Sequence, residues 1–272
     1  MHLKDLKFAL VAIGFFLLIP IKARTEDVES TVRQAEKGDP RAQYELGDMY
    51  IHGESVTKSD EEAVKWYRKA ADQGYVRAQY ELGNMYKHGQ GVSKSDEEAA
   101  KWYRKAADQG YVRAQYELGD MCKHGEGVPK SDEEAVKWYR KAADEGYARA
   151  QYELGGMYEY GQGVTKSDEE AAKWYRKAAD QGLAEAQLSL GSMYAEGIGA
   201  TQSTEEQEAV KWYRKAADQG LAEAQFYLGS MYAEGEGVAQ SDEEAVKWYR
   251  KASAQGLTEA QDALDILQRK GK

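Results

Sequence analysis

The sequence of 272 residues contains little cysteine, asparagine or proline. Its one cysteine, Cys122, excludes an intramolecular disulfide and a cysteine-based zinc or iron–sulfur site. The only asparagine, Asn84, precedes Met-Tyr, so the chain has no N-glycosylation sequon. A formal net charge of −10 argues against binding to nucleic acid, which needs a clustered basic surface. Because no disulfide can form within the chain, the stability of the fold must come from burial of side chains.

Motifs typical of enzymes are missing as well. There is no Ser-His-Asp arrangement, no Gly-rich phosphate loop and no metal-spaced His/Cys cluster. His52, His88 and His124 recur at one repeat position, and a ladder of metal ligands is one interpretation. Neighbouring helices lie about 8–10 Å apart, too far to share an ion easily, so solvated helix ends are the simpler interpretation. We expect a protein that is not an enzyme and that has no cofactor and no metal site.

The first residues differ from the rest of the chain. Lys4 and Lys7 precede 14 uncharged residues, Phe8 to Ile21, and a small residue, Ala23, follows. This pattern predicts a signal peptide over residues 1–23 and a secreted or periplasmic protein, most simply of a bacterial cell envelope. A retained membrane anchor is the weaker alternative because the apolar run is short for a bilayer. After cleavage we expect no stable membrane insertion.

Repetition dominates the remaining sequence. The pair Ala-Gln recurs at spacings of 36, 36, 36, 36, 38 and 36 residues, and the six tryptophans step in the same way. A fixed period of this length predicts stacked supersecondary units. Six units run over 39–74, 75–110, 111–146, 147–182, 183–220 and 221–256. We expect residues 24–38 to form an N-terminal capping half-repeat and residues 257–272 to form a C-terminal capping helix.

The second half of each unit predicts a helix, called helix B, which spans about 14 residues after Ser95 in the second unit. Ser95 and Glu98 match the capping box, and Glu97 with Lys101 matches an i,i+4 ion pair. Trp102 falls on one face with Tyr103 and several alanines, whereas the basic residues fall opposite. The repeated tryptophan is either a binding site or a core residue, and its alanine neighbours favour the core.

The first half of each unit predicts another helix, called helix A, over residues 76–89. Leu82, Met85 and Tyr86 share its inward face, and Gly83 fits a position where another helix crosses closely. Cys122 replaces tyrosine at the inward Tyr86 position and is expected to be a buried small residue. The expected fold is all-α, without strands.

The pattern A-x-x-x-L-G-x-M-Y-x-x-G-x-G-V followed by D-E-E-A-x-K-W-Y-x-K-A-A-x-x-G resembles the Sel-1-like repeat (SLR) family, which is related to tetratricopeptide proteins. The resemblance covers residues 39–256. It implies a right-handed α/α superhelical solenoid whose helix A lines a concave groove. It also implies an adaptor or scaffold that assembles protein complexes. A cysteine-rich branch of the family is linked to penicillin-type ligands, and the lack of a cysteine pair excludes carrying that activity over.

Sequence variation between units is concentrated on helix A. The variable positions, those of Arg77, Tyr80, Asn84, Lys87 and His88, lie on one side of the helix, opposite Leu82. They change from basic and tyrosine-rich in the first units to acidic with Leu or Phe in the last. Tyrosine and arginine are common at the energetic centres of interfaces. The candidate partner-binding residues are Arg41, Tyr44, Arg77, Tyr80, Lys87, His88, Arg113, Tyr116, Lys123, Arg149, Tyr152, Tyr160, Glu185, Glu223 and Phe226.

These patterns lead to one main hypothesis, an exported scaffold that binds a protein or peptide segment of opposite charge polarity in the groove. Recent duplication of two repeat lineages, without selection on the groove, also explains the variation. A receptor for a small cell-wall or peptide ligand, without catalysis, is the alternative function, and self-association through the ends of the repeat array is a third. The sequence does not name the partner.

Overall fold

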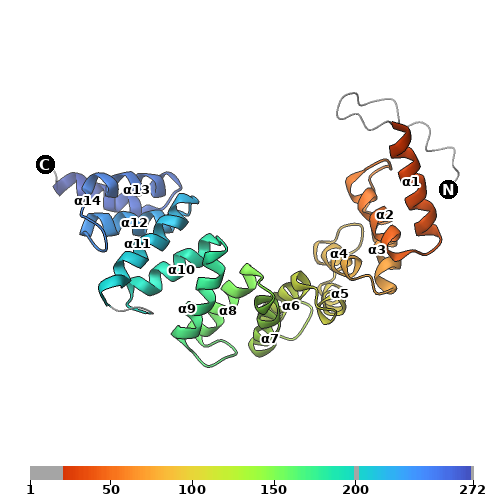
Figure 1. Cartoon of the computed structure of the whole chain (residues 1–272), viewed down its shortest axis with the longest axis horizontal. Coiled ribbons are helices and arrows are strands. Elements are labelled where there is room, and N and C mark those ends of the chain that lie inside the picture. The colour runs from red at the N-terminus through yellow and green to blue at the C-terminus, as the bar shows by residue number, and fades with distance from the viewer. Residues whose placement is uncertain (1–20, 199–201, 271–272) are drawn as a thin grey trace. The chain divides into compact units, whose positions relative to one another are not determined.

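The computed structural model describes residues 21–198 and 202–270, and this part of the chain contains fourteen α-helices and no strand (Figure 1). The predicted all-α fold of repeated helix pairs is confirmed. Most of the predicted signal peptide, residues 1–20, lies outside the described residues. The helices are α1 (Ile21–Glu36), α2 (Pro40–His52), α3 (Asp60–Asp72), α4 (Val76–His88), α5 (Asp96–Asp108), α6 (Val112–His124), α7 (Asp132–Asp144), α8 (Ala148–Tyr160), α9 (Asp168–Asp180), α10 (Ala184–Ala195), α11 (Gln202–Asp218), α12 (Ala222–Glu234), α13 (Asp242–Ala254) and α14 (Thr258–Lys270).

Even-numbered helices are the A helices of the repeats, and odd-numbered helices are the B helices. The chain divides into two compact units, one containing α1–α6 and the other α7–α14. Within each unit, every helix packs against its neighbours in the chain, so that α4, for example, lies between the B helices α3 and α5. None of the helices in the described ranges is both long and apolar enough to cross a membrane.

Four B helices, α3, α5, α9 and α13, begin at a serine N-cap, as α5 illustrates. The Ser95 hydroxyl accepts a hydrogen bond from the Glu98 backbone N–H at 3.2 Å, as predicted. The prediction that the Glu98 side chain accepts from the Ser95 N–H is wrong, because this N–H donates to the Tyr86 carbonyl at the end of α4. The Glu98 side chain instead pairs with Lys101 at 2.5 Å, which replaces the predicted Glu97–Lys101 pair. The serine thus caps helix B and also anchors it to helix A.

Five A helices, α2, α4, α6, α8 and α12, end at glycines in the left-handed conformation. Gly89, with φ of 70°, terminates α4, and its N–H donates to the Met85 carbonyl. The second glycine of the loop, Gly91, is required by a close approach of two backbones. A Cβ at this position would lie 2.4 Å from the Asp60 carbonyl carbon and oxygen at the start of the previous B helix. Ser55 takes this place in the first repeat and is the only non-glycine residue with positive φ in the described ranges. The loop between helices A and B of one repeat therefore packs against the B helix of the preceding repeat.

The core consists of one set of side chains that recurs through the repeats. Trp102, Trp138, Trp174, Trp212 and Trp248 are buried, as are the tyrosines that follow them and the alanines one turn further on. The core interpretation of the tryptophan is thereby confirmed for these five, whereas Trp66 is half-buried. The ammonium group of Lys105 lies 3.7 Å from the centroid of the Trp102 ring, and each of the other tryptophans is covered by the lysine three residues later. These lysines shield the aromatic edge of the core from solvent.

Buried glutamines connect each A helix to the B helix of its own repeat and to that of the preceding one. The Gln79 side-chain amide donates to the Ala71 carbonyl at 3.1 Å, and its oxygen accepts from Gln109 Nε2 at 2.7 Å. Pairs of the same kind join Gln43 to Gln73, Gln151 to Gln181, Gln187 to Gln219 and Gln225 to Gln255. The invariant Ala-Gln of the sequence therefore places one small and one hydrogen-bonding residue in the core.

Successive repeats are also joined by arginine–tyrosine contacts. The Arg68 guanidinium on α3 donates to the Tyr86 hydroxyl on α4 and lies 5.7 Å from the centre of that ring. Arg140 with Tyr158, Arg176 with Tyr194 and Arg214 with Tyr232 form the same contact. Cys122 holds the tyrosine position in α6 and is 3% exposed, so the prediction of a buried small residue is confirmed.

Candidate functional site

The helix-A surface consists of the positions of Arg77, Tyr80, Glu81, Asn84, Lys87 and His88 and their equivalents in the other repeats. The predicted binding residues on it divide into two groups by exposure. Eight are exposed: Arg41, Arg77, His88, Arg113, Arg149, Tyr160, Glu185 and Glu223. Seven are half-buried: Tyr44, Tyr80, Lys87, Tyr116, Lys123, Tyr152 and Phe226. The exposed group is accessible to solvent, whereas the half-buried group also contributes to packing.

The half-buried tyrosines pack between helices. The Tyr80 ring centroid lies 5.8 Å from that of Tyr103 on the same repeat's B helix and 5.1 Å from that of Tyr111, which precedes α6. Tyr44 is placed in the same way, and Phe226 lies 5.6 Å from Tyr249. These half-buried rings therefore contribute to packing within a repeat and, for Tyr44 and Tyr80, to packing on the next repeat.

The residue at the Asn84 position accepts a hydrogen bond from the tyrosine hydroxyl of the B helix in most repeats. The Tyr103 hydroxyl donates to Asn84 Oδ1 at 2.7 Å, and the Tyr67 hydroxyl donates to Asp48 at 2.5 Å. In the last two repeats, the Tyr213 and Tyr249 hydroxyls donate to serines at this position, Ser192 and Ser230. Repeat 4 has Gly156 here, and the Tyr175 hydroxyl donates to Glu159 instead, at 2.5 Å. Every residue used can accept a hydrogen bond, so packing accounts for part of this variation.

Sequence reasoning missed the position that follows the tyrosine, occupied by Glu45, Glu81, Glu117, Glu153, Ser189 and Tyr227. Glu117 accepts a hydrogen bond from Lys87 Nζ of the preceding repeat at 2.8 Å, and both side chains are about three-quarters buried. Burial disfavours the charged Lys87, but the hydrogen bond and charge of Glu117 outweigh it and raise the pKa of Lys87. The change from glutamate in the early repeats to serine and tyrosine in the late ones could have identified this position from the sequence.

These carboxylates alter the predicted character of the first repeats. Burial raises the pKa of the Glu81 carboxyl, and the nearby charge of Asp48 raises it further. Burial likewise raises the pKa of Tyr67, whose hydroxyl is bound to Asp48. The helix-A surface of α2 and α4 is therefore mixed in charge rather than basic, because the exposed arginines stand beside half-buried acids.

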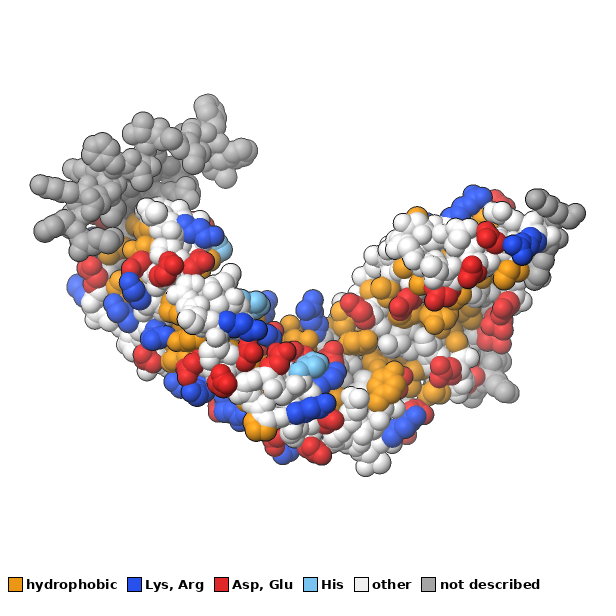
Figure 2. Space-filling model, turned by 180° about the vertical axis from the view of Figure 1, so that it is seen from behind, with side chains coloured by type: hydrophobic (Ala, Val, Ile, Leu, Met, Phe, Trp, Pro, Cys, Tyr) orange, Lys and Arg blue, Asp and Glu red, His pale blue; other side chains and the backbone are white. Residues whose placement is uncertain are grey.

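The later repeats carry a different set. In α10 and α12 the helix-A surface contains no lysine or arginine, and a glutamate stands at each of its ends. Tyr160 and Tyr227 are 69% and 43% exposed, which makes them two of the three large exposed hydrophobic residues in the described ranges. In Figure 2, acidic side chains border hydrophobic ones over the C-terminal unit.

The histidines hold ordinary positions at helix ends. Nδ1 of His88 lies 2.9 Å from the Asn84 carbonyl, and Nδ1 of His124 lies 2.9 Å from that of Asp120. Each ring is thereby tied to its own helix. Across residues 21–198 and 202–270, no three His, Cys, Asp or Glu side chains are grouped so that they could hold a metal ion.

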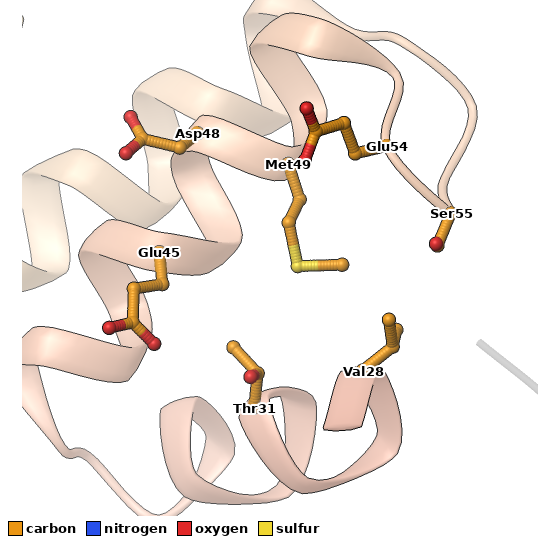
Figure 3. A pocket seen from close by; sticks show the side chains of 7 residues that line it. All are labelled: Val28, Thr31, Glu45, Asp48, Met49, Glu54 and Ser55. Carbon is orange, nitrogen blue, oxygen red and sulfur yellow. The ribbon is translucent and has the colours of Figure 1, made fainter. Parts of the chain in front are cut away.

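A pocket of about 290 Å³ lies between α1 and α2 (Figure 3). Thr31 and Ser30 of α1 stand where later B helices carry tyrosine and tryptophan, so no aromatic ring fills the space. Figure 3 shows the Met49 side chain reaching toward Thr31 and Val28. The remaining lining residues are Glu45, Asp48, Glu54 and Ser55.

Comparison with known proteins relates this arrangement to repeat proteins of bacteria. The family model of the Sel1 repeat matches residues 40–75, 76–111, 112–147, 148–183, 184–221 and 222–257. The structure of a Sel1 repeat protein from Oxalobacter formigenes is similar with a TM-score of 0.68 and 33% identity, over 83% of this chain and 96% of that one.

Two further relatives come from Escherichia coli. The structure of a protective antigen of uropathogenic strains, which displays an SLR fold, has a TM-score of 0.70 and 37% identity, over 90% of this chain and 60% of that one. The secretory immunoglobulin A-binding protein EsiB of strain O6:H1 is 34% identical over 69 residues, which are 25% of this chain and 14% of EsiB. The chain thus spans 60% of the antigen's structure, and its match to EsiB is confined to a small part of that protein.

Proposed function

Because the chain belongs to the Sel1 repeat family, we propose that it is a non-catalytic scaffold or adaptor that binds a segment of a partner protein along its helix-A surface. Sel1 repeat proteins generally mediate protein–protein interaction. Of its two E. coli relatives, one is a protective antigen and the other binds secretory immunoglobulin A, so both are consistent with a protein that acts by binding.

One observation carries the proposal: the repeats share a nearly identical core but differ in the side chains that helix A presents to solvent. The exposed position of Arg41, Arg77, Arg113 and Arg149 becomes Glu185 and Glu223 in the last repeats. Core packing does not require this reversal, because these side chains are exposed. Recognition of a partner with an asymmetric charge pattern accounts for it.

The proposed place of action is outside the cytoplasm. The basic start and short apolar run of residues 1–23 support export, and a single buried cysteine suits an oxidising compartment. A fusion of residues 1–23 to a reporter that is active only after export tests this part. A reporter that stays inactive contradicts it.

The scaffold is tested by affinity capture from the envelope fraction of the parent organism, followed by mass spectrometry. We expect a stoichiometric partner, and we expect Arg77→Glu/Arg113→Glu to lose it. Arg104→Glu/Arg250→Glu is the matched control, because both arginines are exposed on B helices and the charge change is the same. Equal capture by both double variants would show that the partner does not use this surface.

The alternative is a receptor for a small cell-wall or peptide ligand, bound without catalysis. It predicts no stoichiometric protein partner in the capture experiment. It also predicts that soluble cell-wall fragments raise the melting temperature of the purified protein. Together, these two results would replace the scaffold by the receptor.

A further inference from the structure

Charge compensation differs between the two kinds of helix in the C-terminal unit. On the B helices, the third acidic residue pairs with the lysine three residues later: Glu170 with Lys173 at 3.1 Å, Glu208 with Lys211 at 2.9 Å and Glu244 with Lys247 at 3.1 Å. On the A helices, Glu185, Glu196, Glu223 and Glu234 are exposed, and none has an ion pair among the described residues. Four negative charges on this surface are therefore left without a cation.

The four glutamates occupy a regular arrangement. Glu185 and Glu196 are 11 positions apart, as are Glu223 and Glu234, which returns each pair to the same side of its helix about 16 Å apart. Between the ends, α10 presents Ser189 and Ser192, and α12 presents Tyr227 and Ser230. Each helix thus carries one negative charge at each end of a strip without charge.

Apolar side chains accompany this strip. Leu188 and Phe226 are half-buried beside it, and Tyr227 is 43% exposed. The Tyr227 ring is stacked on Tyr213, with centroids 5.3 Å apart, and also contacts Phe226 at 5.6 Å. Because its neighbours already fix the ring, a ligand that covers it would order little additional side chain. Figure 2 shows the mixture of acidic and hydrophobic side chains on this unit.

We propose that the surface of α10 and α12 binds a basic peptide segment of the partner protein, with an apolar side chain packed on Tyr227 and flanking lysines or arginines facing the four glutamates. This inference rests on the proposed scaffold function and specifies the chemistry of its partner. Single exposed ion pairs contribute little, so the apolar contact supplies affinity while the charges supply selection and faster association. A second copy of this chain is a poor ligand because its net charge is −10.

The direct test uses a labelled synthetic peptide with one phenylalanine between lysines about five positions apart, since an extended chain advances about 3.3 Å per residue. Fluorescence anisotropy measures its dissociation constant for the full chain. We expect binding that weakens with added salt, and no binding when glutamates replace the peptide's lysines. Serine in place of the phenylalanine should weaken binding as well.

The variants come from the protein's own repeats. Glu185→Arg/Glu223→Arg introduces the residue that repeats 1–4 carry at this position, so the fold accommodates it. We expect it to weaken peptide binding by about tenfold or more. Glu169→Arg/Glu243→Arg is the control, because it changes the charge equally at exposed positions on B helices. The control should bind as the parent does.

Several results would overturn the inference: equal binding of both variants, equal binding of the acidic peptide, or no binding of the basic peptide up to about 1 mM. Failure here is distinguishable from failure of the scaffold. A partner captured from the envelope that Glu185→Arg/Glu223→Arg still retains would keep the scaffold and refute the basic ligand. Absence of any captured partner would refute the scaffold itself.

Discussion

The Tyr175 ring lies directly over Gly155, so that a Cβ on this glycine would stand 2.7 Å from ring atoms Cδ1 and Cε1. Tyr67, Tyr103, Tyr213 and Tyr249 stand over Gly47, Gly83, Gly191 and Gly229 in the same way. The glycine of the repeated Leu-Gly pair is thus the place where helix B approaches helix A most closely. This confirms the close crossing that the sequence predicted at Gly83.

Adjacent glycines in α8 test this contact. Gly155→Ala should lower the free energy of unfolding by about 1–3 kcal/mol, because the ring must move to admit the methyl group. Gly156→Ala is the control, since its Cβ would meet only the Tyr175 hydroxyl at 3.5 Å. It should raise stability by roughly 0.5–1 kcal/mol through helix propensity. Urea unfolding measures both, and equal effects would show that the contact is not limiting.

The glutamine pair predicts a specific cost for removing an N–H donor. In Gln109→Glu, the new carboxylate cannot donate to Gln79 Oε1, which is left buried without its partner. Stability should fall by about 1–3 kcal/mol at neutral pH. Gln90→Glu, at an exposed loop position, makes the same charge change and should be nearly neutral. Thermal unfolding compares the two variants.

Cys122 offers a gain of stability. The other complete repeats have tyrosine at this position, and in four places it accepts a hydrogen bond from an arginine of the preceding B helix. Cys122→Tyr should give Arg104 the same partner and raise the free energy of unfolding by about 0.5–1.5 kcal/mol. In the reverse variant, Tyr86→Cys, stability should fall. A loss of stability in Cys122→Tyr would mean that repeat 3 is packed differently here.

Glu81 predicts a pH dependence. Its pKa is raised by burial, so it is higher in the folded than in the unfolded chain. In the window that begins near 4.5, the folded protein binds more protons, and the free energy of unfolding falls as pH rises. Glu81→Gln should therefore be more stable than the parent at neutral pH, and this advantage should vanish below about pH 4. Melting temperatures measured across this pH range test the prediction, with Glu236→Gln, at an exposed loop position, as the control.

Much of the fold follows from local sequence. Ser95, the acidic first turn and Gly89 mark helix ends because caps act within a few residues of the chain. Trp102 and Leu82 could be placed in the core because helical periodicity assigns faces without reference to other repeats. The period of the Ala-Gln pair predicted stacked units, and the consensus of each unit carried the resemblance to the family that its model then confirmed. For these reasons the fold of repeated helix pairs was predictable, whereas the function as a scaffold and the candidate binding residues remain proposals.

What the sequence by itself determined is the repeat, its two helices and the residues of its core. Only the tertiary structure decided which side chains meet across repeats: Lys87 with Glu117, Tyr67 with Asp48, and Gly91 with the backbone of Asp60. The physical reason is that these contacts depend on the offset between neighbouring helices, which no local pattern encodes. The same offset places Glu81 in a half-buried position and leaves Tyr227 exposed between Glu223 and Glu234.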